Sequence, residues 1–332
     1  MKTILVTGGL GFIGSNFVRR MLREHPAERI VNFDAMTYAG NPENLRDIEA
    51  STGYEFVHGN ICDRPAVERL FADHDFDAVV HFAAESHVDR SIAGPDVFVM
   101  TNVIGTQIMV DVARAAWKGS YDNRRFLHVS TDEVYGSLGP TDFFCETTPI
   151  APNSPYSASK AGSDLIALAY HHTYGFPTLL TRCSNNYGPY QYPEKLIPVI
   201  IINALHDKAL PVYGDGMQVR DWLYVDDHCS AIDTVLRTGT VGEAYNIGGN
   251  NEMPNIAIVK LILRELKKPE SLITHVTDRL GHDRRYAIDA RKIKRDLGWS
   301  PSARFEEGIV QTIRWYVDNR KWWESLQAKR AA

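Results

Sequence analysis

The chain has 332 residues, of which 44% are hydrophobic and 23% charged, and its formal net charge is −5. This composition is typical of a globular enzyme with one large or two smaller domains. The acidic balance argues against a general nucleic-acid-binding surface.

Cysteine spacing and hydropathy indicate which kinds of site and cellular location to expect. The four cysteines lie far apart and form no C-x-x-C pair. We therefore expect no metal site, no disulfide framework and a reducing, cytoplasmic location. The N-terminus shows no signal peptide, and we expect no apolar run of the ~18 residues that a membrane span needs.

The first predicted strand, Thr3–Val6, leads into a glycine-rich turn and a helical pattern over Ile13–Glu24. Gly8, Gly11 and Gly14 have the spacing G-x-x-G-x-x-G, which lets a backbone turn approach a pyrophosphate at a helix N-terminus. A glycine triplet alone is weak evidence, but the strand before it and the helix after it predict a dinucleotide site.

The second predicted strand, Ile30–Phe33, ends at Asp34, twenty residues past Gly14. A carboxylate there accepts hydrogen bonds from ribose hydroxyls and repels a 2′-phosphate, so the pattern favours NAD. The alternative is a glycine turn that serves packing, followed by a chance aspartate.

Strands and helices continue to alternate. Two more predicted strands, Glu55–His58 and Ala78–Phe82, flank a helix at Arg64–Ala72 for which Asp63 is a plausible N-cap, and a long helix follows over Asp96–Trp117. This alternation predicts an α/β fold with a Rossmann-type, doubly wound parallel sheet. The segments after the third and fourth strands would face the ligand: Gly59–Ile61 and Ala83–His87. The histidine that ends the second segment is either a ligand contact or a loop residue.

A heptapeptide, Ser130–Gly136, follows the next predicted strand, Phe126–Ser130. Thr131, Asp132 and Glu133 therefore stand at the carboxyl end of a strand, where open α/β sheets bind ligands. They are candidates for acid–base chemistry. The residues alone leave open a capping Thr-Asp before a turn.

Tyr156 and Lys160 open the predicted helix that runs to Tyr174, and their i,i+4 spacing puts them on one face. A free tyrosine has a pKa of ~10, too high for a base near neutrality. A nearby lysine ammonium and a positive nicotinamide ring would stabilise the phenolate, so we expect a lowered pKa for Tyr156.

With these motifs in place, the chain resembles the extended short-chain dehydrogenase/reductase family. The run Thr131–Gly136 is similar to the signature of nucleotide-sugar 4,6-dehydratases, whose epimerase relatives lack the Asp-Glu pair. Other stretches are similar to the dTDP-glucose 4,6-dehydratase subfamily: Ala83–Ser91, Cys183–Pro189, Arg220–Tyr224 and Gly281–Tyr286. One departure is Asn60, where related sequences carry aspartate, so a weakened adenine contact is expected.

The resemblance implies a lyase that converts dTDP-glucose to dTDP-4-keto-6-deoxyglucose and water, with tightly bound NAD regenerated in each turnover. Tyr156 would take the C4 hydroxyl proton, Thr131 would hydrogen-bond the same oxygen, and Lys160 would hold the nicotinamide ribose. Glu133 would remove the C5 proton while Asp132 protonates the leaving C6 hydroxyl. Neighbouring extended residues point to opposite sides, and paired carboxyls push their pKa values apart, which would keep Asp132 protonated and Glu133 ionised.

The resemblance also implies two sets of binding residues. The cofactor set is Gly8, Gly11, Phe12, Ile13, Gly14, Asp34, Ala35, Thr37, Asn60, Ile61, Phe82, Ala83, Ala84, Ser86, Thr101, Tyr156, Lys160 and Asn186. The nucleotide-sugar set is Ser86, His87, Thr131, Asn185, Lys195, Leu196, Pro211, Tyr213, Arg220, Asn255, Arg279, His282 and Tyr286. Without the resemblance, each of the latter could equally be a surface charge or a packing residue.

The second half of the chain is less regular. After a strand at Phe176–Arg182, proline- and glycine-rich joints predict a smaller, mixed substrate domain over residues 188–332. The NAD-binding domain would be 1–187, with a segment near 219–250 returning to it. The last predicted helix is Phe305–Arg320, and Trp322 and Trp323 beyond it are expected to pack. A homodimer through the helices at 96–117 and 156–174 is implied by the resemblance.

Two other functions stay open from the residues. One is an NAD-dependent nucleotide-sugar 4-epimerase on the same fold. The other is a non-catalytic dinucleotide-binding protein, which should have lost Tyr156 or Lys160; both are present. The sequence leaves undecided the choice between dTDP and UDP, the downstream deoxysugar pathway (rhamnose is one) and which carboxylate holds the proton at rest.

Overall fold

The computed structural model describes residues 2–331, with side chains as far as Ala328. Its main feature is a seven-stranded sheet in the order β10-β6-β5-β4-β1-β2-β3, in which all neighbours are parallel. The strands are β1 (Thr3–Thr7), β2 (Arg29–Asp34), β3 (Tyr54–His58), β4 (Ala78–His81), β5 (Arg125–Thr131), β6 (Thr178–Cys183) and β10 (Ala244–Ile247). The predicted doubly wound α/β fold is therefore confirmed.

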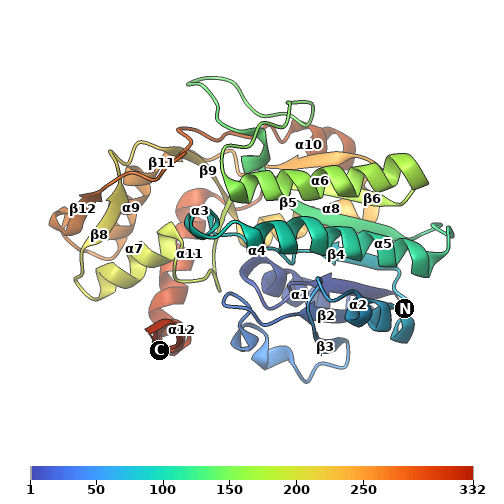
Figure 1. The fold of residues 1–332 in the computed structure, drawn as a ribbon. Coiled ribbons are helices and arrows are strands. Elements are labelled where there is room, and N and C mark those ends of the chain that lie inside the picture. Colours follow the sequence, from blue (N-terminus) through green and yellow to red (C-terminus); the bar gives the residue numbers. More distant parts are fainter. Residues whose placement is uncertain (1, 332) are drawn as a thin grey trace.

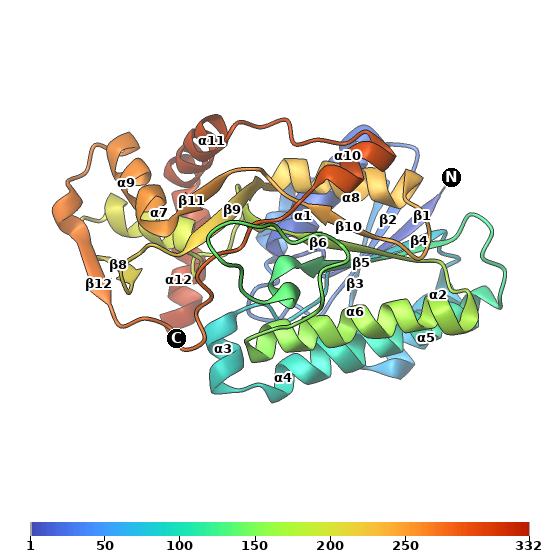
Figure 2. The same ribbon diagram turned by 90° about the horizontal axis from the view of Figure 1, so that it is seen from above.

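Helices cover both faces of this sheet (Figure 2). One face carries α2 (Arg64–Asp73), α5 (Thr106–Trp117) and α6 (Pro155–Tyr174), and the other carries α1 (Phe12–Glu24), α8 (Val225–Thr238) and α10 (Arg291–Leu297). An apolar core lies on each face of the sheet, and alternate residues of β1 belong to one or the other. Ile4 and Val6 pack toward α1 and α8, and Leu5 packs toward α2 and α5. Burial on both faces explains why these strands are near-continuous apolar runs.

The predicted helix over 96–117 is present but is not uniform. It consists of α4 (Asp96–Phe98), a π-helical segment η3 (Val99–Gly105) and α5. By length and composition alone this stretch could cross a membrane, contrary to our expectation, but half of its most apolar window is buried inside the protein. It packs against α6 and α2, as a core helix does.

The remaining elements form a smaller part of the molecule, at the left of Figure 1. It contains a three-stranded sheet of β7 (Asn185–Tyr187), β9 (Val219–Tyr224) and β11 (Glu252–Pro254), and a pair of β8 (Leu210–Tyr213) and β12 (Ile273–Val276). Its helices are α7 (Leu196–Leu205), α9 (Asn255–Glu265), α11 (Phe305–Asp318) and α12 (Arg320–Ala331). A separate apolar core holds α7, α9 and α11 together.

The chain passes between the two parts more than once. Of the segment 219–250 that we expected to return to the main sheet, α8 and β10 do so, but β9 belongs to the three-stranded sheet.

The last predicted helix also needs correction. It ends at Asp318, and a second helix starts at Arg320, with Asn319 between them in a non-helical conformation. Trp323 from that second helix is fully buried in the smaller core, as expected of a packing residue.

Short helices complete the structure. They are α3 (Val88–Ala93) and the 3₁₀ turns η1 (Pro42–Asn44), η2 (Arg46–Ile48), η4 (Asp132–Tyr135) and η5 (Glu270–Leu272).

Candidate active site

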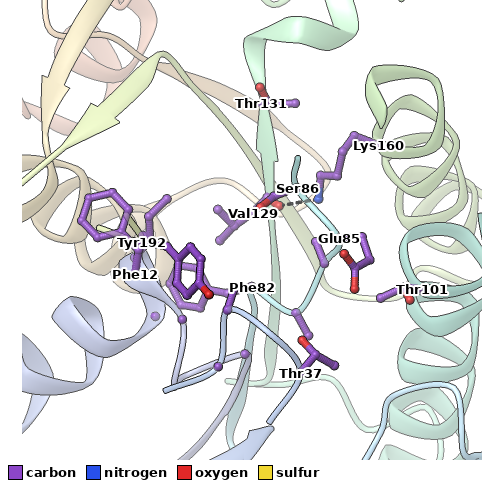
Figure 3. Close-up of a pocket in the computed structure, with 18 of the residues that line it drawn as sticks. Phe12, Thr37, Phe82, Glu85, Ser86, Thr101, Val129, Thr131, Lys160 and Tyr192 are labelled. Atoms are coloured by element: carbon purple, nitrogen blue, oxygen red, sulfur yellow. Dashed lines mark hydrogen bonds between the residues drawn. The ribbon is translucent and has the colours of Figure 1, made fainter. Parts of the chain in front are cut away.

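A cavity of about 340 Å³ lies at the carboxyl ends of the central strands, beside the smaller part of the molecule. Figure 3 shows side chains from the glycine turn, the β4 loop, β5, α6 and the π-helical segment pointing toward it. Every residue of the predicted cofactor set lines this cavity, and so do all five predicted catalytic residues. The structure thus brings together groups that lie up to 178 positions apart, from Gly8 to Asn186.

The glycine turn approaches its neighbours too closely for any side chain. Gly8 has φ +72°, and a Cβ there would lie 2.7 Å from the Ala83 nitrogen. A Cβ on Gly14 would lie 2.3 Å from the Gly8 carbonyl oxygen. Helix α1 begins just beyond, and its N-terminus has no side-chain cap, so its first amides are available to an anion at the cavity.

Asp34 stands at the end of β2 and is tied to this turn. Its Oδ2 accepts from the Leu10 amide at 3.0 Å, its Oδ1 accepts from the Met36 amide at 2.8 Å, and burial raises its pKa. In the loop after the next strand, β3, Asn60 also lines the cavity, and its Oδ1 accepts from the Cys62 amide at 2.9 Å. The free lone pairs of both side chains can accept from a ligand. A glycine cradle, an open helix N-terminus and a strand-end carboxylate fit a dinucleotide.

Lys160 is buried in the wall opposite this turn. Its Nζ donates to the Val129 carbonyl at 2.8 Å, the dashed line in Figure 3, and burial lowers its pKa to about 8. Tyr156 lies one turn earlier on α6 and is also buried. Burial raises the pKa of Tyr156 well above its usual value, Glu133 adds to the rise, and a hydrogen bond with Thr131 opposes it. The protein without its cofactor therefore does not lower the pKa of Tyr156. The expected lowering was for the enzyme with the nicotinamide ring bound, and it stays a prediction.

Asp132 and Glu133 do not continue the strand. Thr131 caps the 3₁₀ turn η4, and its Oγ1 accepts from the Glu133 amide at 3.2 Å. The expected alternation of extended residues is therefore wrong here, because successive side chains in a 3₁₀ turn are about 120° apart. Both carboxyl groups still line the cavity, beside Tyr156.

The two carboxyl groups differ in their surroundings. Burial raises the pKa of Asp132 well above its usual value, and Glu133 and Asp221 add to this; among the described residues, its Oδ2 has no hydrogen-bond partner. Burial also raises the pKa of Glu133, but Arg220, Lys195 and Arg279 oppose the rise. Both pKa values are raised, and the balance of surrounding charges favours the proton on Asp132.

The predicted nucleotide-sugar set divides into two groups. Four of its members line the cavity: Ser86, Thr131, Asn185 and Lys195. The others do not, and belong mostly to the smaller part: His87, Leu196, Pro211, Tyr213, Arg220, Asn255, Arg279, His282 and Tyr286.

Several of these outer residues contact one another. The Arg220 guanidinium lies 4.3 Å from the centre of the Tyr286 ring, and that of Arg279 lies 5.3 Å from the centre of the Tyr213 ring. Arg279 also pairs with Asp89, with Nη2 and Oδ2 2.9 Å apart. The buried Oδ1 of Asn255 has no hydrogen-bond partner among the described residues. These side chains form a polar, cation-rich extension of the site.

Some cavity residues were not in either predicted binding set. They are Phe33, Tyr38, Ala39, Gly40, Gly59, Glu85, Val129, Ser130, Cys183, Ser184, Gln191, Tyr192 and Glu194. Gly59 and Glu85 belong to segments that we expected to face the ligand, and Ser130, Cys183 and Ser184 lie inside motifs described above, but none of the five had an individual role. Tyr38 and Glu194 carried no local signal, because they meet across the fold: the Tyr38 hydroxyl donates to Glu194 Oε1 at 3.1 Å. Among the described residues, no group of three or more His, Cys, Asp or Glu side chains could hold a metal ion.

The family model described as GDP-mannose 4,6 dehydratase matches residues 5–312. The chain belongs to this family of nucleotide-sugar 4,6-dehydratases. Within the family, a dTDP-glucose 4,6-dehydratase of Xanthomonas campestris pv. campestris is 58% identical over 335 positions, which cover 97% of this chain and 95% of the relative.

Solved structures of the family agree. The dTDP-glucose 4,6-dehydratase of Bacillus anthracis, in complex with NAD, is 52% identical with a TM-score of 0.91 and covers 98% of this chain and 100% of its own. The enzyme DesIV of Streptomyces venezuelae, solved with NAD bound, is 50% identical with a TM-score of 0.93, covering 98% and 99%. A UDP-glucose 4-epimerase of Thermotoga maritima is more distant, at 28% identity and a TM-score of 0.87, covering 96% and 99%.

Proposed function

We propose that the protein is an NAD-dependent dTDP-glucose 4,6-dehydratase, which converts dTDP-glucose to dTDP-4-keto-6-deoxyglucose and water. One observation carries the proposal: an acid–base pair, the buried Asp132 and the half-buried Glu133, shares a cavity with Tyr156 and Lys160. Simple hydride transfer needs only the second pair, whereas loss of water needs a base and an acid in addition. The dehydratase relatives at 50–58% identity support the same reaction.

NAD fits the residues that line the cavity. The amides of Phe12 and Ile13 at the start of α1 would hold the pyrophosphate, Asp34 the adenosine ribose, and Asn60 the adenine edge. When bound, NAD supplies an acceptor for hydride from C4 of the sugar and a donor of hydride to C6. A cofactor restored within each turnover has no need to leave, so we propose that it stays bound.

Residues on α6 and at the end of β5 would carry out the oxidation half of the reaction. Tyr156 would accept the proton of the C4 hydroxyl, and Thr131 would hydrogen-bond the same oxygen. Because the protein raises the pKa of Tyr156, its deprotonation relies on the positive charge of Lys160 and of the oxidised nicotinamide. Lys160 would also hold the nicotinamide ribose.

The two carboxyl groups of η4 would carry out the elimination half of the reaction. A ketone at C4 makes the C5 proton acidic, and Glu133, whose negative charge is favoured by three cations, would remove it. Asp132, whose pKa is raised well above its usual value, would hold a proton near neutral pH and deliver it to the leaving C6 hydroxyl. Water leaves, and the proton taken by Glu133 returns to C5 after reduction at C6.

The anionic diphosphate would bind at the cation-rich extension, where Lys195, Arg220 and Arg279 all act on Glu133 electrostatically. We propose residues 1–187 with α8 and β10 as the NAD-binding domain and most of 188–332 as the nucleotide-sugar domain. In this division the catalytic carboxyls stand at the boundary.

We also propose a homodimer in the cytoplasm. The face formed by α4, η3 and α6 exposes Val97 by 46%, Val99 by 48%, Met100 by 51% and Leu165 by 56%. Such a concentration of exposed apolar side chains is typical of an interface. Among the described residues the four cysteines are unpaired, which suits a reducing compartment.

Product analysis tests the function. Incubation of the purified protein with dTDP-glucose should give the alkali-absorbing 4-keto-6-deoxy product, and incubation with UDP-glucose should give much less. Formation of dTDP-galactose would instead identify an epimerase. Tyr156→Phe should abolish turnover, because the C4 hydroxyl then has no base; normal turnover in this variant would contradict the assignment.

A further inference from the structure

Tyr135 ends the turn η4 that begins with Asp132 and Glu133, yet it does not line the cavity. Its side chain points into the protein and is only 3% exposed. Its hydroxyl accepts from Arg182 Nη1 at 2.8 Å and donates to Asn246 Oδ1 at 2.8 Å. Both hydrogen-bonding capacities of this buried phenol are therefore used for anchoring the turn.

The first anchor leads to the helix that carries Tyr156 and Lys160. Arg182, on β6, donates from Nε to Asp164 Oδ2 at 2.9 Å, and its guanidinium lies 4.9 Å from the centre of the Tyr135 ring. Asp164 is fully buried on α6, one helical turn after Lys160. Its pKa is lowered although burial opposes this, because hydrogen bonding to His128 and the charge of Arg182 outweigh burial. Ionised at neutral pH, Asp164 fixes Arg182 through a charge-assisted bond.

The second anchor leads to β10 and the loop before α6. Asn246 donates from Nδ2 to the Phe144 carbonyl at 3.0 Å, and its backbone amide donates to Glu146 at 2.9 Å. The Phe144 ring in turn stacks on Tyr135 with 5.0 Å between centroids. The phenol is thus held from both sides by buried side chains that are themselves hydrogen-bonded, Arg182 to Asp164 and Asn246 to the Phe144 carbonyl, and such a network rigidifies its surroundings.

We propose that Tyr135 is a positioning residue, which with Arg182 and Asp164 fixes the acid–base turn η4 relative to the oxidation helix α6. The inference rests on the proposed function, in which the two halves act on one sugar that does not leave between them. The pair Asp132 and Glu133 must reach C5 and C6 while C4 stays against Tyr156. A chain of hydrogen bonds from α6 through β6 to η4 supplies that fixed separation.

Tyr135→Phe tests this, because it keeps the ring stacking and removes both hydrogen bonds. In single-turnover experiments with the NAD-loaded enzyme and dTDP-glucose, reduced nicotinamide should form at the wild-type rate. Its decay, and product formation, should slow roughly ten- to hundredfold, since small misplacements of catalytic groups have effects of this size. Exchange of the C5 proton with deuterated solvent should slow by a similar factor, while KM stays unchanged.

Tyr245→Phe is the matched control. Tyr245 is also buried, at 1% exposure, and its hydroxyl accepts from the Thr240 amide at 3.0 Å, but it lies on the edge strand β10 and does not line the cavity. Its time course should equal that of the wild type. Arg182→Lys provides a second variant that keeps a cation beside Asp164 and loses the guanidinium fork, and it should show the same selective slowing as Tyr135→Phe.

The outcomes are distinct. Selective slowing of elimination in either anchor variant supports the inference. A wild-type time course in both, or equal slowing of oxidation and elimination, overturns it, because a purely structural role would damage both steps alike. A wild-type enzyme that forms no 4-keto-6-deoxy product overturns the proposed function, and this inference with it.

Discussion

Glu133 is half-buried, and three cationic side chains, Arg220, Lys195 and Arg279, favour the ionised form of its carboxyl group. As the proposed base it should be indispensable for elimination but not for oxidation. We expect Glu133→Gln to form reduced nicotinamide with dTDP-glucose and to release product at a rate lower by about 10²–10⁴-fold, the usual contribution of a general base. Stopped-flow absorbance and product analysis check this. A wild-type product rate would show that Glu133 is not the base.

Asp132 should behave differently, since its role begins only after the C5 proton has moved. We expect Asp132→Asn to slow product formation while exchange of the C5 proton with solvent survives. Mass spectrometry of substrate recovered from deuterated buffer measures that exchange. Loss of exchange together with product in Asp132→Asn would instead place Asp132 at the proton-abstraction step.

Burial of the Lys160 ammonium group lowers the free energy of unfolding of the protein. Its folded-state pKa of about 8, against an ordinary 10.5, means that burial disfavours its charged form. At pH 7 the unfolded chain and the folded chain both hold the proton, so the folded chain bears that penalty. We expect Lys160→Met to raise the free energy of unfolding of the NAD-free protein at about pH 7 by roughly 1–3 kcal/mol, while abolishing activity.

The sign of the pH dependence follows from the lowered pKa. Between pH 8 and 10.5 the unfolded chain binds more protons at Lys160 than the folded chain, so wild-type stability rises with pH through this window. The advantage of Lys160→Met should therefore shrink as the pH increases. Urea unfolding of both proteins at several pH values measures this, and a variant less stable than the wild type at neutral pH would contradict it.

At the scale of elements, the π-helical segment η3 is the part of the helix 96–117 that contacts the candidate site. Its Asn102 is buried and accepts from the Glu85 amide at 2.8 Å, while its Nδ2 donates to the Glu85 carbonyl at 3.0 Å and to Ser159 Oγ at 2.8 Å. These bonds hold the loop after β4 against α6. A widened helical turn is often found at functional sites, and here its Thr101 lines the cavity.

We expect Asn102→Ala to lower the free energy of unfolding by roughly 2–4 kcal/mol, because three hydrogen bonds are lost and buried backbone groups stay unpaired. The same variant should retain less NAD after purification. Asn203→Ala, which removes one exposed hydrogen bond to the Ala209 carbonyl, serves as the control and should cost about 1 kcal/mol or less. Equal effects of the two substitutions on unfolding would contradict the role of Asn102.

The main-sheet strands and the helices around them were predictable, and the reason is physical. Strands such as β1 and β5 are buried on both faces and therefore leave near-continuous apolar runs in the sequence. The π-helical segment was not predictable, because Val99–Gly105 has the same helical composition as its surroundings. The form of η4 was missed for a similar reason: the Thr131 cap that bends the chain into a 3₁₀ turn serves equally well in an extended strand end.

The candidate site was predictable where its residues share a short motif. The glycine turn, the Thr131–Glu133 run and the Tyr156–Lys160 pair all line the cavity. Tyr38 and Glu194 could not be found in this way, since their contact depends on how the loop after β2 meets the segment before α7. The directions of the pKa shifts were likewise beyond spacing arguments, because burial dominates at Tyr156 and Lys160.

At the scale of the whole molecule, the exposed apolar face of α4, η3 and α6 should control assembly. We expect Met100→Asp to convert the proposed dimer to monomer, because a carboxylate would be buried without a partner at the interface. Leu280→Asp is a matched control: Leu280 is 77% exposed but does not belong to α4, η3 or α6, and its variant should remain dimeric. Analytical ultracentrifugation measures both, and a dimeric Met100→Asp protein would place the interface elsewhere.

The position of β10 has a consequence for how the protein is made. Residues 244–247 pair with β6, so the seventh strand of the sheet comes from a part of the chain synthesised well after residue 187. Until then β6 is an open edge, with unpaired amides and carbonyls that could join another chain. The nascent N-terminal half therefore depends on its own C-terminal half for protection. The two parts of the molecule have separate apolar cores, but the main sheet is complete only once both have been synthesised.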